Sequence, residues 1–250
     1  MKLDRELLYW VEKCSAKITV VRFYRWAVPT ISLGKHQRAE EAVDQIFCQR
    51  EAIPIVRRPT GGRAVFHDNE LTYSLVSNHC QYFSLENVRD TYRVIAAGLK
   101  AGLRRLGISA QLAEGFRHSQ PVPPSGRKNP CFLSPSQYEL LLRGSKIVGS
   151  AQRRLRQSFL QHGSIPLLVD YPQMAAALGI QEKVLRKTLL SVSEASGHQV
   201  CFATLCNALK EGFEETFQVQ LKVFHQDSGV PLFSALRLLW QNCVPLDDYT

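Results

Sequence analysis

The chain has 250 residues, 45% of them hydrophobic, and a formal net charge of +9. This length and apolar content predict a single domain over residues 1–250, because a chain of this size can bury one large core. No stretch reaches the roughly 18 apolar residues of a membrane span, and the charged start lacks the apolar segment of a signal peptide, so we expect a cytoplasmic protein without a membrane partner.

Hydrophobic periodicity predicts a series of short elements in the first half of the chain. The helix over residues 84–106 has the clearest pattern, with a single apolar stripe and Gly107 at its end. The elements before it are expected, in order, as a helix at 2–13 with Leu3, Leu7, Leu8 and Val11 on its apolar side, a strand at 18–23, a loop at 27–37, a helix at 38–50, a buried strand at 53–57, a turn at two adjacent glycines and a strand at 70–76.

The second half begins with a proline-rich segment, residues 119–130, which predicts a surface loop. A β-hairpin follows, with YELLL and KIVGSA as its strands and Arg143-Gly144-Ser145 as its turn. The mixture of strands and helices predicts an α+β fold, in which helices cover a mixed, largely antiparallel sheet. The remaining elements are expected as a strand at 158–168, helices at 172–178, 181–190, 200–217 and 232–242, and a strand at 219–224.

Positive charge is concentrated in the middle of the chain. The segment from Arg89 to Arg156 holds 13 Lys and Arg against 3 Asp and Glu, a net charge of +10, so the rest of the chain sums to −1. A basic region of this kind indicates an acidic partner, such as nucleic acid, an anionic membrane or an acidic protein, or simply a cationic soluble surface. Helix-turn-helix, zinc-finger and aromatic RNA-binding motifs are missing from the sequence, so we expect no nucleic-acid partner.

The cysteine pattern argues against a metal or disulfide framework. Seven is an odd number, and no pair has the C-x-x-C spacing of a zinc or redox site. We therefore predict no metal and no cofactor, and interpret most of the cysteines as small buried residues. They lie at positions 14, 48, 80, 131, 201, 206 and 243.

The segment RRPTGGRAVFHDNELTYS, residues 57–74, combines flexible and reactive residues. Adjacent glycines at Gly61 and Gly62 allow positive φ angles and close approach of the backbone to a ligand. Successive exposed amides can then form a concave anion site, to which neighbouring arginines would add charge. The alternative is an ordinary hairpin turn. A phosphate-binding Walker loop is excluded, because the G-x-x-x-x-G-K-[ST] pattern is missing.

Four segments of the chain, in this order, resemble motifs of the biotin/lipoate protein ligase superfamily. The resemblance covers about residues 3–225 and implies the ligase-like catalytic domain of that superfamily, here over residues 1–250. It also implies an acyl group carried as an adenylate or a thioester and passed to a lysine of a lipoyl domain or of the glycine-cleavage H protein. The segments are WAVPTISLGKHQ (26–37), the arginine-rich segment 57–74, GSKIVGSAQRR (144–154) and LQHGSIPL (160–167).

One further segment separates two activities of the superfamily. Residues 130–152, PCFLSPSQYELLLRGSKIVGSAQ, are similar to the octanoyltransferases, whereas ligases typically have Asn-Asp where Tyr138-Glu139 stands. The similarity implies that Cys131 is the nucleophile, and a thiolate suits transfer from one thioester to an amine through a second thioester. The donor would be octanoyl-acyl carrier protein. The alternative activity is an ATP-dependent lipoate–protein ligase or a lipoyl/octanoyl amidotransferase.

The resemblance also implies roles for other polar residues. Lys146 would stabilise the oxyanion of the acyl carbonyl as a cation. His67 would orient or deprotonate the cysteine or the incoming amine, or else cap the glycine loop. Arg58 would contact the substrate. His162 belongs to the motif, and the sequence assigns it no role.

Residues of the expected acyl channel complete the candidate site. Small residues, Gly149 and Ser150 among them, follow Lys146 and suit a strand that lines a narrow tunnel. Tyr73 would either line the same channel or pack in the core. Together with Gly61 and Gly62, these residues form the predicted substrate-binding set.

Overall fold

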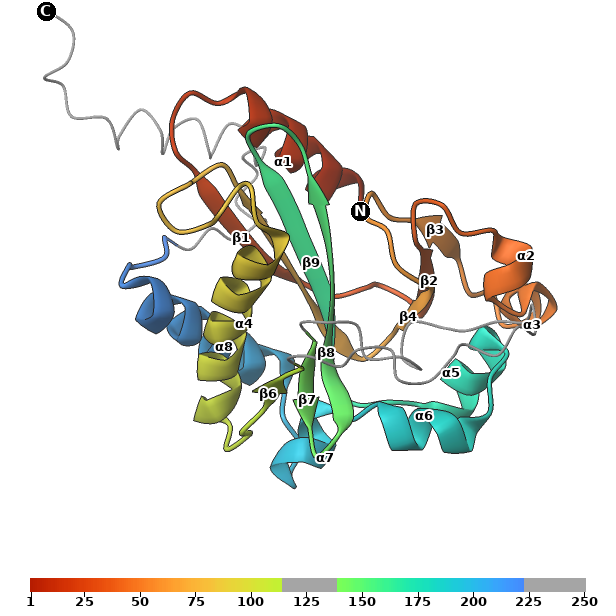
Figure 1. Ribbon diagram of the computed structural model, residues 1–250. Coiled ribbons are helices and arrows are strands. Elements are labelled where there is room, and N and C mark those ends of the chain that lie inside the picture. Colours follow the sequence, from red (N-terminus) through yellow and green to blue (C-terminus); the bar gives the residue numbers. More distant parts are fainter. Residues whose placement is uncertain (114–138, 223–250) are drawn as a thin grey trace, which may run out of the picture. The chain divides into compact units, whose positions relative to one another are not determined.

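The computed structural model describes residues 1–113 and 139–222 (Figure 1). Its contacts divide the chain into a compact unit, Met1–Val219, and a second unit, Gln220–Thr250, of which only residues 220–222 are described. The first unit contains every element discussed below. Within the described residues, no helix combines the length and apolarity needed to cross a membrane.

The first unit is built around two sheets (Figure 1). In the larger sheet, every neighbouring pair of strands is antiparallel. The smaller sheet joins one parallel and one antiparallel pair. The predicted mixed, largely antiparallel sheet is therefore confirmed. In spatial order the larger sheet contains β1 (Thr19–Tyr24), β5 (Glu70–Ser77), β9 (Phe159–Pro166), β8 (Ser145–Arg154), β7 (Leu140–Leu142) and β6 (Gln111–Leu112), and the smaller contains β3 (Ile55–Arg57), β2 (Thr30–Leu33) and β4 (Val65–His67).

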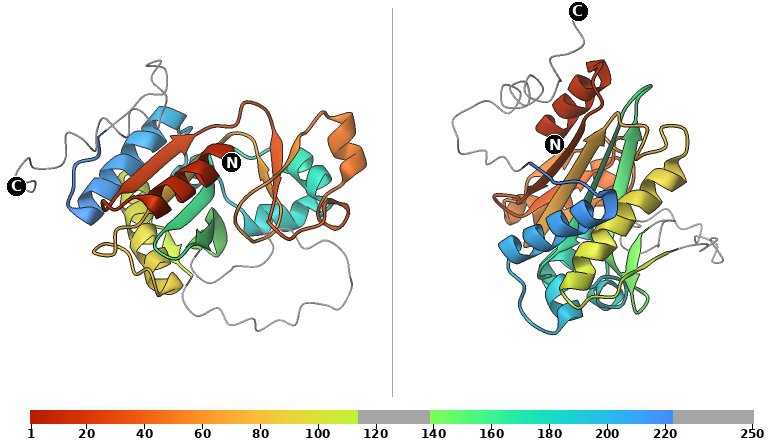
Figure 2. Two further views of the ribbon diagram at one scale, coloured as in Figure 1. Left: turned by 90° about the horizontal axis from the view of Figure 1, so that it is seen from above. Right: turned by 90° about the vertical axis from the view of Figure 1, so that its left-hand side faces the viewer.

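Helices cover both faces of the larger sheet (Figure 2). Neighbouring residues of a strand point to opposite faces, and β1 shows which helix covers which face. The ring of Phe23 stacks against Phe213 of α8, whereas Arg22 and Tyr24 bond to Asp4 of α1. The helices are α1 (Lys2–Lys13), α2 (Ala39–Ala42), α3 (Gln45–Arg50), α4 (Val88–Arg105), α5 (Tyr171–Leu178), α6 (Glu182–Thr188), α7 (Val192–Ser196) and α8 (Phe202–Phe217).

Helices α4 and α8 cross closely enough to exclude side chains at the contact (Figure 2). A methyl group added to Gly212 would lie 2.3 Å from the Gly102 nitrogen and 2.6 Å from the Gly98 oxygen. Glycines at these positions therefore bring the two helix backbones together, and the apolar faces of both helices can pack on the sheet.

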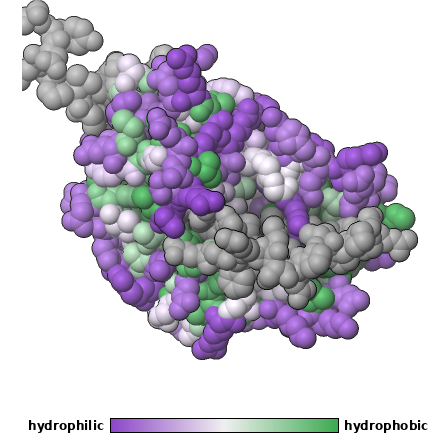
Figure 3. All heavy atoms as spheres, viewed as in Figure 1, coloured by the Kyte–Doolittle hydropathy of each residue, from purple (hydrophilic) through white to green (hydrophobic). Residues whose placement is uncertain are grey.

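The closely packed α4–α8 pair also neutralises part of the basic region. Arg104 donates to Glu215 at 2.8 Å, and Arg105 contacts Glu211 and Glu215 at 2.9 and 3.0 Å. The acidic residues lie outside the basic segment in sequence, so the net charge of that segment overstates the charge on the folded surface. On the face seen in Figure 3, hydrophilic residues are interspersed with smaller hydrophobic areas over the described residues.

Most of the predicted elements are confirmed. The predicted hairpin turn has positive φ at both Arg143 (52°) and Gly144 (83°), as a tight turn that matches the strand twist requires. Gly107, with φ of 75°, follows the end of α4 in the same left-handed region. The predicted helix at 232–242 and the proline-rich segment 119–130 lie outside the described residues.

Several predictions in the 27–67 region were wrong. The expected loop at 27–37 contains β2, and β4 was not predicted at all, because each is too short to show a period. The expected helix at 38–50 is two helices, since Asp44 caps α3 by accepting from the Phe47 amide. Strand β3 is half-buried to exposed rather than buried.

Two further predictions in the C-terminal half also failed. Helix α7 was missed, although Ser191 and Glu194 form a capping box at its start. No strand is present at residues 219–222, and residues 223 and 224 of that expected strand lie outside the described part.

Candidate functional site

A pocket of about 460 Å³, a volume that includes its opening, is lined by residues from both sheets. Strands β2 and β4 contribute from the smaller sheet, and β5, β8 and β9 from the larger. Six of the residues that the sequence predicted for the site line this pocket: Arg58, His67, Lys146, Gly149, Ser150 and His162. The predicted nucleophile, Cys131, lies outside the described residues.

Lys146 is held in the pocket by a buried ion pair. Its Nζ lies 2.6 Å from Oε1 of Glu139, and both side chains are 3% exposed. The paired strands β7 and β8 set this position, because Lys146 lies opposite Leu141 across the sheet. The carboxylate offsets the cost of burying an ammonium group, so the pocket contains a fixed cation next to its small strand residues.

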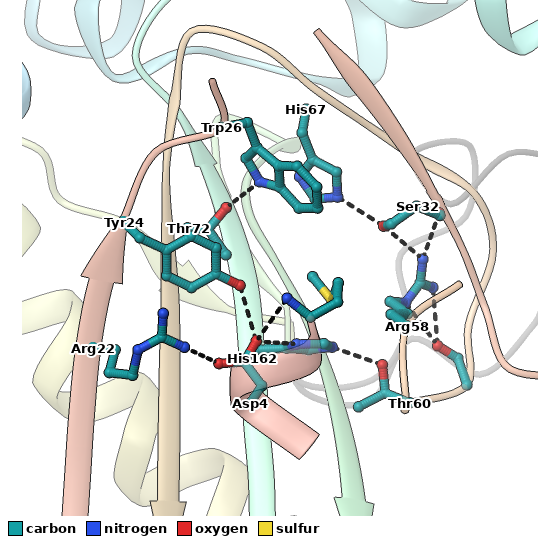
Figure 4. Close-up of polar contacts among 12 residues, drawn as sticks. Asp4, Arg22, Tyr24, Trp26, Ser32, Arg58, Thr60, His67, Thr72 and His162 are labelled. Carbon is teal, nitrogen blue, oxygen red and sulfur yellow. Dashed lines mark hydrogen bonds and ion pairs between the residues drawn. The ribbon is translucent and has the colours of Figure 1, made fainter. Parts of the chain in front are cut away.

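His67 is the centre of a second buried contact set (Figure 4). Its Nε2 lies 2.7 Å from Oγ of Ser32, and its Nδ1 lies 2.8 Å from Oε1 of Glu70. The ring of Trp26 stacks on the imidazole, with centroids 4.3 Å apart. The imidazole is therefore fixed in position and rotation by three side chains from β2, β5 and the segment before β2.

His162 belongs to a third contact set, on the α1 side of the same pocket (Figure 4). Its Nε2 lies 2.7 Å from the Thr60 hydroxyl, and its Nδ1 lies 3.7 Å from Asp4. Burial lowers the pKa of His162, although the Asp4 carboxylate favours the charged form. The Thr60 contact thus joins the ring to the loop before the twin glycines, and the other ring nitrogen faces Asp4 of helix α1.

Asp4 is fully buried and accepts from Arg22 and Tyr24 as well as facing His162. Burial alone would raise its pKa, but the facing His162 and the charge of Arg22 outweigh burial and hold the pKa well below the ordinary value of 3.8. Because the pKa of Asp4 is lower in the folded protein than in the unfolded chain, the unfolded chain binds the proton more readily. The Asp4 carboxylate therefore stabilises the fold at pH values above its ordinary pKa of 3.8, and this stabilisation is lost as the pH falls below that value.

We expect Asp4→Asn to lower the free energy of unfolding by about 3 kcal/mol at neutral pH, since it removes the charged partner of Arg22. The difference from wild type should narrow as the pH falls below about 4, where the unfolded carboxyl becomes protonated. Urea unfolding at neutral pH and in acid measures both values. A deficit that stays constant into strong acid would contradict this account of Asp4.

The twin-glycine loop is shaped by Arg58 and by a close backbone contact. The guanidinium of Arg58 donates to backbone oxygens of Ser32, Gly61 and Arg63 at 2.6–3.2 Å. Gly62 has φ of 91°, which favours glycine, and its open side faces the Arg58 Nη2. These contacts give Arg58 a structural role in fastening the loop, and its predicted contact with substrate stays a prediction.

A glycine outside the twin pair has the least space. A methyl group added to Gly34 would lie 1.9 Å from the Gly62 oxygen, whereas one added to Gly61 would meet nothing within 4 Å. We expect Gly34→Ala to destabilise the protein by about 3 kcal/mol, near the upper end for overpacking because the obstacle is backbone. The matched Gly61→Ala should change stability by less than about 0.5 kcal/mol. Thermal unfolding of both variants tests this, and equal losses would contradict it.

Tyr73 packs behind the pocket wall. Its ring lies against Gly163, where an added methyl group would be 2.4 Å from a ring carbon. Its hydroxyl contacts the Ser150 hydroxyl at 2.6 Å and accepts from Gln161 at 3.0 Å. Burial raises the pKa of Tyr73 to about 12, so the phenol stays neutral. Tyr73 therefore supports the strand that bears Ser150, and its role in an acyl channel stays a prediction.

Several polar residues of the site were not predicted, among them Asp4, Glu70 and Ser32. Asp4 takes the place expected for Leu3 on the buried side of α1, which it shares with Leu7, Leu8 and Val11. The signal that could have identified it is an acidic residue at helical spacing from apolar ones. Glu70 follows His67 by three residues across a tight turn, which is a weaker signal. Ser32 gave no signal, because its strand was not recognised.

The described cysteines only partly fit the expectation of buried residues. Cys48 is buried, whereas Cys80 and Cys201 are exposed. Cys201 caps α8, and hydrogen bonds from the Thr204 hydroxyl and amide hold the pKa of its thiol below the usual value. Cys243 lies outside the described residues. No cluster of three or more metal-binding side chains occurs in residues 1–113 and 139–222.

Comparison with solved structures identifies the fold. Lipoate-protein ligase A bound with ATP matches with a TM-score of 0.73 at 24% identity, over 95% of this chain and 87% of that one. A bipartite lipoate protein ligase from Thermoplasma acidophilum matches with a TM-score of 0.70 at 21% identity, over 96% and 88%. At these identities the structural likeness concerns the fold.

Sequence comparison identifies the family. The chain is 36% identical over 234 residues to the octanoyltransferase LipM of Geobacillus kaustophilus, which covers 90% of this chain and 84% of that protein. It is 40% identical over 213 residues to the octanoyltransferase LipM of Kyrpidia tusciae, over 81% and 77%. The model of the lipoyl protein ligase A/B catalytic domain matches residues 1–214. With these matches over most of its length, the chain belongs to the lipoyl protein ligase A/B catalytic domain family.

Proposed function

We propose that this protein is an octanoyltransferase of lipoate biosynthesis, which moves an octanoyl group from acyl carrier protein to a lysine of a lipoyl domain or of the glycine-cleavage H protein. The observation that carries the proposal is the 35–40% identity to octanoyltransferases named LipM over most of the chain. The pocket supports it, because a fixed ammonium and a buried imidazole lie among small strand residues. Each of these groups has a use in acyl transfer.

In the first half-reaction, the Cys131 thiolate attacks the thioester carbonyl of octanoyl-acyl carrier protein. A carbon–sulfur bond forms to Cys131, the bond to the carrier sulfur breaks, and the proton released when the Cys131 thiol ionised passes to the carrier thiolate as it leaves. Negative charge develops on the carbonyl oxygen as the tetrahedral intermediate forms. The Lys146 ammonium supplies a positive charge for this oxygen, and the Glu139 carboxylate keeps the ammonium in place.

In the second half-reaction, the acceptor lysine amine attacks the octanoyl–Cys131 thioester. A carbon–nitrogen bond forms, the carbon–sulfur bond breaks, and the amine loses a proton that ends on the cysteine thiol. The products are an amide and the free enzyme. The same ammonium stabilises both tetrahedral intermediates, so one pocket serves both steps.

The donor requirement tests this function against an ATP-dependent ligase. We expect the protein to label a lipoyl domain with octanoyl-acyl carrier protein in the absence of ATP, and not with free octanoate plus ATP. Intact-mass measurement of the lipoyl domain after each incubation gives the answer. Labelling that requires ATP and free octanoate would reject the proposal and favour the ligase. Salt-sensitive DNA binding without acyl transfer would favour the nucleic-acid alternative.

A further inference from the structure

The contacts of Ser32 fix the position of its hydroxyl proton. Arg58 can only donate hydrogen bonds, and its Nη1 lies 3.2 Å from the Ser32 Oγ. The Ser32 oxygen therefore accepts from Arg58 and keeps its own proton for another acceptor. Nε2 of His67, at 2.7 Å, is that acceptor (Figure 4).

The contacts of Trp26 fix the positions of the protons on the Glu70 side of His67 in the same way. An indole can only donate, and the Trp26 Nε1 lies 2.9 Å from the Thr72 Oγ1 (Figure 4). The Thr72 hydroxyl therefore donates to Oε1 of Glu70. Since this carboxylate oxygen accepts, the 2.8 Å contact from His67 Nδ1 must carry the proton on the nitrogen. The Nε2 lone pair of a neutral His67 thus points at the Ser32 hydroxyl.

Ser32 connects this chain of contacts to the pocket. Ser32 is one of the residues that line the pocket, as are His67 and Lys146, and it is fully buried in the protein without substrate. A hydroxyl oxygen has two lone pairs, so Ser32 can accept a proton from a group in the pocket while it passes its own proton to His67. The Glu70 carboxylate, which also accepts from Ser164, would stabilise the imidazolium that results.

Two groups lose a proton in the proposed reaction, the Cys131 thiol and the acceptor lysine amine, and the amine requires more assistance. A lysine amine has an ordinary pKa of about 10.4 and a cysteine thiol one of about 8.5. Near neutral pH the acceptor lysine attacks from its small neutral fraction, and the attacking nitrogen must still lose a proton before the amide forms. A base in the pocket is consequently of most use in the second half-reaction.

We propose that Ser32, His67 and Glu70 form a proton relay for the second half-reaction, an assignment that rests on the proposed function. As the neutral amine attacks the octanoyl thioester, its proton moves to Ser32 Oγ while the Ser32 proton moves to His67 Nε2. The same path returns a proton to the departing Cys131 thiolate, so His67 ends neutral. In this relay Ser32 touches the substrate, and Glu70 is a positioning residue.

Other ionisable groups lie close to His67. Arg58, Lys146 and His162 line the same pocket, and the Glu70 carboxylate contacts its Nδ1. Asp68, which follows His67 in the chain, adds a second carboxyl group beside it. The second hydroxyl–imidazole–carboxylate set, around His162, differs in two respects: its carboxylate, Asp4, lies 3.7 Å from the ring nitrogen, and its hydroxyl residue, Thr60, is not among the residues that line the pocket.

A single-turnover experiment tests the relay apart from the function. Octanoyl-enzyme is first formed from octanoyl-acyl carrier protein and purified, and its discharge onto a lipoyl domain is followed by intact mass between pH about 5 and about 9. We expect Ser32→Ala and His67→Gln to slow discharge about 10²-fold, while octanoyl-enzyme forms as in wild type. Glu70→Gln should slow discharge less and move the midpoint of the pH profile to lower pH, because an amide stabilises the imidazolium less than a carboxylate does.

Ser77→Ala is the matched control, since it removes another buried serine hydroxyl from the larger sheet, one that bonds to Thr19. It should leave discharge unchanged. If Ser32→Ala and His67→Gln discharge octanoyl groups at the wild-type rate and with the wild-type pH profile, the relay alone is rejected. An octanoyl adduct on Ser32 would also reject it. A wild-type enzyme that forms no octanoyl adduct would reject the proposed function, and the relay with it.

Discussion

Replacing Lys146 by methionine is expected to slow octanoyl transfer about 10²- to 10³-fold, the usual loss when one oxyanion donor is removed. Methionine retains the length of the side chain but carries no charge. Both half-reactions pass through a negatively charged intermediate, so both should slow. Stopped-flow or quench measurements of each half-reaction, with the lipoyl domain as acceptor, give the two rates.

The same substitution removes the ion-pair partner of Glu139, so stability must be measured alongside activity. We expect Lys146→Met to lose about 3–5 kcal/mol of unfolding free energy. Adding Glu139→Gln should recover part of this loss without restoring transfer. Lys210→Met is the control for loss of a lysine charge, because Lys210 pairs with Glu214 at 2.8 Å in a more exposed position and does not line the pocket. Near-normal transfer by a folded Lys146→Met enzyme would refute the oxyanion role.

Replacing Cys131 by alanine should have an effect at least as large, a loss of about 10³-fold or more in transfer, because no other group then carries the octanoyl chain between the two partners. The kinetic readout is the rate of lipoyl-domain labelling at saturating octanoyl-acyl carrier protein. Cys201→Ala is the matched control. Its thiol is exposed and has a lowered pKa, so it is the described cysteine most readily ionised, and its removal should leave the rate unchanged.

The sequence was most informative where an element is long or a motif is specific. Helix α4 was predicted from periodicity, because its apolar stripe repeats along the whole helix. Strand β8 was predicted from the hairpin turn before it, whereas β5 and β9 are buried almost throughout and show no alternation in burial. The motif resemblance selected Lys146, His67 and His162, and the fold brings these three residues to one pocket.

The sequence was least informative where a residue acts through contacts made by the tertiary fold. Ser164 reaches the Glu70 carboxylate only because β5 pairs with β9, and neither strand reveals its register on its own. Ser32 meets His67 because the short strands β2 and β4 pair, and their three or four residues show no period.

The twin glycines illustrate a partial success. The sequence correctly indicated a loop that needs positive φ, and Gly62 has it. It did not predict that the neighbouring arginine would fill the space beside that glycine, or that Gly34 would be the position with the closest backbone contact. The second fact depends on contact with the segment that bears Gly34, far from Gly62 in the sequence, for which local patterns carry no information.

The most direct test of the central claim is the intact mass of the enzyme after exposure to octanoyl-acyl carrier protein without ATP. We predict a mass increase of one octanoyl group in wild type, removed by hydroxylamine and missing from Cys131→Ala. A wild-type enzyme that transfers octanoyl groups while no such adduct forms, or an adduct that persists in Cys131→Ala, would contradict it.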